Sequence, residues 1–144
     1  MYSFRKSKKG FTLIELMVVV AIIGVLALLG LRLYTGQQMK AKNAIVKANA
    51  GTIQTLIQAE LADTTSLLVD AMVDDGTSDG LFAKSGIHVP DGGPQVANDT
   101  TGVVGTVYVV YDTTTTGSEF FTINGNSFDV PSEPVYTTPL TARK

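Results

Sequence analysis

The chain has 144 residues, with no cysteine, no tryptophan and one histidine, His88. Without cysteine it has no disulfide, thiolate zinc site, Fe–S cluster or thiol nucleophile. A single histidine cannot build a histidine-based metal site within one chain. No Ser-His-Asp grouping has supporting context, and no glycine loop matches a phosphate cradle. We therefore expect no enzymatic activity, no cofactor and no metal.

Charge is also scarce, at 17% of the residues, and it is unevenly distributed. Residues 1–10 and residues 32–47 each carry four basic side chains and no acidic one. From residue 48 onward, twelve acidic side chains accompany only three basic ones. The net charge of −2 therefore hides a basic first third and an acidic remainder. This acidic remainder argues against binding to nucleic acid phosphates, so we expect no nucleic acid partner.

One long apolar run, residues 11–31, lies between the two basic segments, and Glu15 is its one charged residue. As a helix these residues extend about 32 Å, close to the thickness of a hydrocarbon core. The run is apolar on all sides, which favours lipid over a protein core. A secretory signal peptide fits less well, because residues 31–34 (LRLY) contain no small-residue cleavage site. We predict a membrane-spanning helix.

The helical pattern continues through residues 32–62, which contain no proline. Apolar residues recur there every three or four positions, at Val46, Ala50, Ile53, Ile57 and Leu61. This spacing forms one apolar stripe. We predict a single helix of about fifty residues, apolar in its first half and amphipathic in its second, which packs on the C-terminal half of the chain.

Beyond residue 63 the pattern predicts mixed structure. A short helix should follow a cap at Thr65 or Ser66 and end before Gly76. Residues 74–102 are rich in glycine, aspartate and proline, which favours a long irregular connection. Its DDGTSDG segment lacks the spacing of a calcium loop, so a solvated loop is expected. Residues 98–100 (NDT) match a glycosylation sequon, which is a frequent chance match.

The C-terminal part predicts an antiparallel meander at about residues 103–130. Residues 103–112 are β-branched and aromatic on both faces, as in a central strand. Asn124-Gly125 indicates a two-residue hairpin that would place Phe121 opposite Phe128. The tail with its prolines should cross the surface or cover a sheet edge, and these prolines are Pro131, Pro134 and Pro139.

The segment KKGFTLIELMVVVAIIGVLALLG, residues 8–30, closely resembles the class III signal and N-terminal helix of type IV pilins. The features that carry the resemblance are a basic leader, Gly10, Phe11 and a glutamate four residues later in an otherwise apolar helix. It covers about 40 residues, and the rest matches only in layout. It implies an α+β, pilin-like fold with a long N-terminal helix packed on a small antiparallel sheet.

The resemblance also implies a processing scheme. A prepilin peptidase would cleave between Gly10 and Phe11, and Phe11 would then be N-methylated. Residues 1–10 would be the cleaved leader, 11–31 the transmembrane and filament-core helix, 32–62 its amphipathic continuation, and 63–144 a globular region. The chain would lie in the inner membrane as a precursor and afterwards in an extracellular pilus on the bacterial surface.

Glu15 and two glycines are the residues singled out for assembly. An unpaired carboxylate within lipid costs about 2.5–3.5 kcal/mol by insertion scales. In the family this glutamate is thought to pair with the N-terminal amine of a neighbouring subunit, here that of Phe11; solvation at the interface is the other interpretation. Many members carry a proline where Arg32 stands. Gly24 and Gly30 therefore either allow local unwinding or serve close helix packing.

The function implied is that of a prepilin, a structural subunit that polymerises through its retained helix. Its partners would be identical subunits, the prepilin peptidase, the inner-membrane assembly machinery and, before assembly, the membrane. Two alternatives remain open. One is a pseudopilin of a type II secretion or competence system, and the other is a membrane-tethered binding module with a pilin-like export signal.

Overall fold

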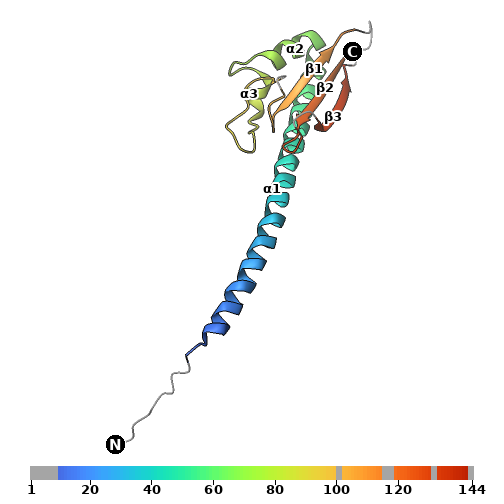
Figure 1. Cartoon of the computed structure of the whole chain (residues 1–144). Coiled ribbons are helices and arrows are strands. Elements are labelled where there is room, and N and C mark those ends of the chain that lie inside the picture. Colours follow the sequence, from blue (N-terminus) through green and yellow to red (C-terminus); the bar gives the residue numbers. More distant parts are fainter. Residues whose placement is uncertain (1–9, 100–101, 115–118, 131–132, 143–144) are drawn as a thin grey trace, which may run out of the picture. The chain divides into compact units, whose positions relative to one another are not determined.

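A computed structural model describes residues 10–99, 102–114, 119–130 and 133–142 of the chain (Figure 1). The chain divides into two compact units, residues 1–37 and residues 38–144, and we call the second unit the head. The first helix, α1 (Leu13–Asp63), has 51 residues and belongs to both units. The prediction of one helix of about fifty residues is confirmed.

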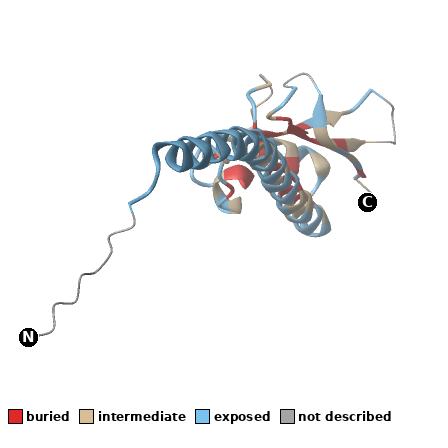
Figure 2. Ribbon diagram, turned by 60° about the horizontal axis from the view of Figure 1, so that its bottom comes forward, coloured by how far each residue is buried: buried red, intermediate tan, exposed pale blue. Residues whose placement is uncertain are grey.

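The second half of α1, residues 38–63, contributes the apolar stripe to the core of the head. Four residues of the predicted stripe are completely buried, and the fifth, Leu61, is partly buried against the same cluster. Figure 2 shows buried positions on this part of the helix and on the sheet. The completely buried stripe residues are Val46, Ala50, Ile53 and Ile57. The three-and-four spacing therefore identified the face of the helix that packs within the chain.

The sheet is an antiparallel meander in the order β1-β2-β3. Its strands are β1 (Val107–Asp112), β2 (Phe120–Asn126) and β3 (Pro134–Thr141). In the register, Val109 pairs with Ile123, and Phe121 pairs with Tyr111 on one side and Leu140 on the other. The α+β, pilin-like layout with a three-stranded antiparallel sheet is thus confirmed.

The predicted hairpin at Asn124-Gly125 is wrong, because both residues lie inside β2. Asn124 pairs with Tyr108 on β1 and with Thr137 on β3. A Cβ at Gly125 would lie only 2.7 Å from Cγ1 of Val46 on α1. The glycine therefore allows the helix to approach the sheet closely, and it does not form a turn.

The strand predicted at residues 103–112 begins only at Val107, and it is an edge strand and not a central one. Just before it, Gly105 has a φ of 78°, and a Cβ there would lie 2.2 Å from the Phe128 ring. Phe128 therefore packs over Gly105, while Phe121 stacks on Tyr111 with ring centroids 4.7 Å apart. The predicted pairing of Phe121 with Phe128 is wrong.

The proline-containing tail forms a strand, so the meander extends to residue 141 and not 130. β3 is an edge strand that contains Pro134 and Pro139. Proline lacks an N–H group, which confines it within sheets to edge strands and strand starts. Pro131 lies outside the described residues.

Between α1 and the sheet lie two short helices. The predicted α2 (Ser66–Asp74) is confirmed, with Thr65 at the N-cap position, although the Thr65 side chain makes no capping hydrogen bond. The connection after it is not wholly irregular, because it contains α3 (Leu81–Ser85). Leu81 and Phe82 are both buried in the core. That adjacent apolar pair, followed by Lys84 in the last turn and by Gly86 as the left-handed C-cap, was the signal for α3 in a segment dominated by turn residues.

Two side-chain amides from the connection bond to the outer edge of β1. The Gln95 amide accepts from the backbone N–H of Val107 at 3.0 Å and donates to the carbonyl of the same residue. The Asn98 amide accepts from Val109 N–H at 2.8 Å and donates to Val109 O at 2.9 Å. Asn98 is thus held in the fold by both ends of its amide, which argues against its use as a glycosylation acceptor.

Candidate functional site

The first half of α1, residues 13–37, presents an apolar surface over residues 13–31 that no described residue of the chain covers. Every described residue from Gly10 to Gln37 is exposed. Phe11 is 85% exposed, and large aliphatic side chains such as Leu26 are also exposed, at 62%. In the described part of the chain, α1 is the one helix long and apolar enough to cross a membrane. Such a surface requires lipid or other protein around it.

The N-terminus of α1 is closed by hydrogen bonds between Thr12 and Glu15. The Glu15 carboxylate accepts from the Thr12 backbone N–H at 2.9 Å and from the Thr12 hydroxyl at 2.7 Å. In return, Thr12 Oγ1 accepts from the backbone N–H of Glu15 at 3.3 Å. This reciprocal arrangement is a capping box, in which the side chains satisfy N–H groups that the helix leaves unpaired. It also places a negative charge in the first turn, where the helix dipole favours it.

The capping box changes the interpretation of Glu15. Within a single chain the carboxylate already has two donors, both on Thr12, so it is not an unsatisfied charge before it meets another subunit. Sequence reasoning considered Glu15 without Thr12. The T-x-x-E spacing of TLIE just before the apolar run was the available signal.

The other predicted site residues lie on this same segment. Gly10 is exposed, and the leader residues 1–9 lie outside the described part of the chain. Gly24 and Gly30 both lie within the continuous helix, and a Cβ at either position would meet nothing within 4 Å. Neither glycine is therefore needed for packing against the described residues of the chain. What remains for them is a role in contacts between copies or in helix flexibility.

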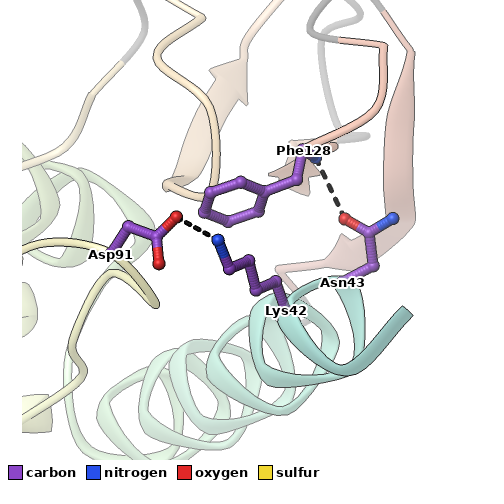
Figure 3. A network of polar contacts seen from close by, with 4 residues as sticks. All are labelled: Lys42, Asn43, Asp91 and Phe128. Atoms are coloured by element: carbon purple, nitrogen blue, oxygen red, sulfur yellow. Dashed lines mark hydrogen bonds and ion pairs between the residues drawn. The ribbon is translucent and has the colours of Figure 1, made fainter. Parts of the chain in front are cut away.

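A second polar cluster fixes α1 within the head (Figure 3). Lys42 forms an ion pair with Asp91, and its Nζ atom lies 5.2 Å from the centroid of the Phe128 ring. Asn43 Oδ1 accepts from Phe128 N–H at 3.0 Å, and Asn43 Nδ2 donates to Asp129 Oδ2 at 3.1 Å. Sequence reasoning counted Lys42 only as a charge. Its role in the structure is to hold two loops of the head against the helix.

Nothing in the described residues resembles a catalytic centre. They contain no group of three or more His, Cys, Asp or Glu side chains that could hold a metal ion. Hydrogen bonds from Thr77, side chain first and then backbone, lower the pKa of Asp75. Thr114 lowers the pKa of Asp112 in the same way. Both carboxylates stabilise turns, and shifts of this kind need no catalytic explanation.

Comparison with known proteins identifies a matching family model and related sequences. A family model described as a prokaryotic N-terminal methylation motif matches residues 5–31. The fimbrial protein EcpB of Eikenella corrodens is 47% identical over 55 residues, which is 38% of this chain and 35% of that protein. No solved structure matches the chain. The family model therefore matches the basic leader and the apolar run, and the described residues of that run are exposed.

Two relatives reach into the head. Both are type IV major fimbrial proteins FimA of Dichelobacter nodosus. One is 35% identical over 94 residues, 65% of this chain and 54% of the relative. The other is 32% identical over 110 residues, 69% of this chain and 70% of the relative. The chain spans about half or less of the first two relatives described here, but more than two thirds of the last. The chain belongs to the type IV pilin family, the family of type IV fimbrial proteins.

Proposed function

We propose that this chain is a structural subunit of a type IV pilus. The observation that carries the proposal is the contrast along α1, whose first half is largely apolar and wholly exposed while its second half buries one apolar stripe in the head. A single copy cannot cover the first half, but a bundle of such helices from many copies can. The family of structural subunits to which the chain belongs supports the same function.

Processing follows from the same proposal. The prepilin peptidase cleaves between Gly10 and Phe11, and Phe11 becomes N-methylated at the new terminus. The inner membrane holds the precursor through residues 11–31, and the assembly machinery transfers it into a filament on the cell surface. Gly10 is exposed and lies just before the helix, which supports access of a peptidase to this bond.

The direct test is mass analysis of filaments sheared from cells that produce the protein. We expect a mature chain that begins at N-methylated Phe11. A filament subunit that still carries residues 1–10 would contradict the processing scheme. Absence of long surface fibres would favour the pseudopilin alternative, and a processed chain that stays monomeric in the membrane would favour a tethered binding module.

Glu15 is proposed to pair with the Phe11 amine of a neighbouring copy during assembly. Because the carboxylate is held by Thr12 within its own chain, two variants are needed to separate the local role from the one between copies. Glu15→Gln keeps an oxygen that can accept from Thr12 but removes the charge, whereas Glu15→Ala removes both. We expect both variants to reduce the yield of filaments. Assembly of Glu15→Gln at the parental level would contradict the charge pairing.

Gly24 and Gly30 are proposed to allow local change in the helix during assembly, in place of the proline that is absent near Arg32. Alanine fits sterically at both positions and favours the helix by roughly 1 kcal/mol each. The variant Gly24→Ala/Gly30→Ala should therefore stiffen the helix without disturbing the head. If the double variant formed filaments at the parental yield, and α1 in them were helical over the same length as in parental filaments, this role would be contradicted.

A further inference from the structure

The second half of α1 carries two exposed basic side chains that form no ion pair with any described residue. Lys40 and Lys47 are both exposed and lie seven residues apart, about two helical turns, so they are on the same side of the helix. Among the described residues the one ion pair is that of Lys42 with Asp91, and it involves neither of them. We call Lys40 and Lys47 the basic row.

The basic row lies on the side of the helix that faces β3. Gln54 is the next residue in the same seven-residue series, and its Oε1 accepts a hydrogen bond from the Tyr136 hydroxyl on β3. Lys42 and Asn49 belong to a different side, because they contact Asp91 and the carbonyl of His88 in the connection before the sheet. The row is thus open to solvent beside the β3 edge of the head.

The complementary charge lies at the opposite edge of the sheet. Asp70 and Asp74 are one turn apart on α2, and Asp74 accepts from the Asn98 amide, which also bonds to Val109 on β1. Figure 1 shows α2 beside β1, with β3 on the other side of β2. We call Asp70 and Asp74 the acidic pair.

The acidic pair is electrostatically unfavourable in the isolated chain. Partial burial and the neighbouring charge of Asp74 raise the pKa of Asp70. Like charges one helical turn apart repel each other, and a cation placed beside them would relieve that repulsion. Lys84 on α3 acts on Asp75 and not on Asp70, and Lys40 and Lys47 lie at the β3 edge.

We propose that the basic row of one copy binds the acidic pair of the next copy in the filament. The inference rests on the proposed function and names the surface through which heads meet. The two patches differ, so the contact is heterologous, and repetition of such a contact produces an open polymer and not a closed dimer. Apolar helix packing is non-directional. Opposite charges, in contrast, determine which neighbouring copy binds and in which register adjacent subunits pack.

The absence of native cysteine in this chain makes a clean cross-linking test available. In the double variant Lys47→Cys/Asp70→Cys, we expect oxidation of sheared filaments to produce a ladder of disulfide-linked oligomers. Either single variant should give no ladder, because each contact would then contain one cysteine. A matched control pairs Lys47→Cys with Glu133→Cys, an exposed acidic position that is not on α2. Equal ladders from both pairs, or none from the first, would overturn the proposal.

Charge reversal provides a second test with an internal rescue. We expect Lys47→Glu and Asp70→Lys each to reduce filament yield several-fold, and the combination of both to restore most of it. High salt should weaken the charge contact in parental filaments and have less effect on apolar helix packing.

Unchanged filament yield in both single variants would overturn the contact between heads while the pilus function stands. If the parent formed no filaments at all, the proposed function itself would fail. Retention of Lys47→Glu monomers in the membrane at the parental level would exclude a lipid headgroup as the partner of the row.

Discussion

The two halves of α1 form one continuous helix but have opposite relations to the rest of the chain. From residue 13 to residue 37 every side chain is exposed, whereas four residues of the second half are completely buried. The difference lies in periodicity and not in helical propensity, because residues 16–31 are apolar on all sides of the helix, whereas the second half is apolar in one stripe. An apolar stripe can be covered by a single sheet, while a fully apolar helix needs partners all around it.

The largest effect should come from a charge placed in the first half. Leu26→Lys puts an ammonium group within the apolar run, five residues before its end at Leu31, which costs up to about 2.5–3.5 kcal/mol in a membrane and leaves the charge without a partner in a helix bundle. We expect loss of membrane integration and of filaments, measured by fractionation and by sheared filament mass. Gln58→Lys, on the exposed side of the second half, is the control and should assemble normally. If Leu26→Lys formed normal filaments, the first half of α1 would not need an apolar environment, and the contrast with the second half would be contradicted.

A cavity in the second half should have the next largest effect. Ile53 is completely buried, so Ile53→Ala should lower the free energy of unfolding of the head by about 2–5 kcal/mol. Leu26→Ala should leave head stability unchanged, because Leu26 is exposed and lies outside the head. Denaturant unfolding of the full chain in detergent, followed by near-ultraviolet circular dichroism, measures both. A similar loss in the two variants would contradict the comparison.

A smaller effect is expected where polar contacts fix the second half. Asn43→Ala removes the acceptor for Phe128 N–H and the donor to Asp129, at a cost of about 1–2 kcal/mol. Lys40→Ala, on the same stretch but without a partner among the described residues, should change head stability by less than about 0.5 kcal/mol. The same unfolding assay compares the two variants. Equal losses in the free energy of unfolding would show that the Asn43 contacts do not stabilise the head.

The smallest effect should come from the charge of Asp70 on the head. Its pKa is raised in the fold by burial and by Asp74, so the native state binds its proton more tightly than the unfolded chain. Ionised Asp70 therefore destabilises the folded head. This destabilisation is fully present above the raised pKa and absent below the unfolded pKa of about 3.9. Asp70→Asn should raise the melting temperature slightly at pH 7 and leave it unchanged near pH 3. A stabilisation of equal size at both pH values would contradict this origin.

Local periodicity was enough to predict α1 and its buried face. The spacing from Val46 to Ile57 reflects direct packing on one surface, so the sequence carries that information locally. α2 followed from turn residues on either side of a short apolar segment in the same way. The apolar run and its glutamate were recognised for the same reason, since their chemistry does not depend on the rest of the fold.

The sheet was harder to predict because its determinants are distant in sequence. Gly125 resembles a turn residue beside Asn124, but its lack of a side chain serves the approach of Val46, which is 79 positions earlier in the chain. Pro139 resembles a strand breaker, although an edge strand accepts it. The capping contact of Thr12 was local and could have been found, whereas the contacts of Lys42 and Asn43 join α1 to loops that no short pattern identifies.

The amides that bond to the outer edge of β1 affect how heads from many copies can lie close together. An open strand edge pairs readily with any other open edge, which leads to aggregation when many copies are held close together. Gln95 and Asn98 occupy the backbone groups of Val107 and Val109, and prolines interrupt the donors of β3 at the other edge. Neighbouring heads can therefore be concentrated along a polymer without merging into a continuous cross-strand aggregate, and their contacts are left to side chains.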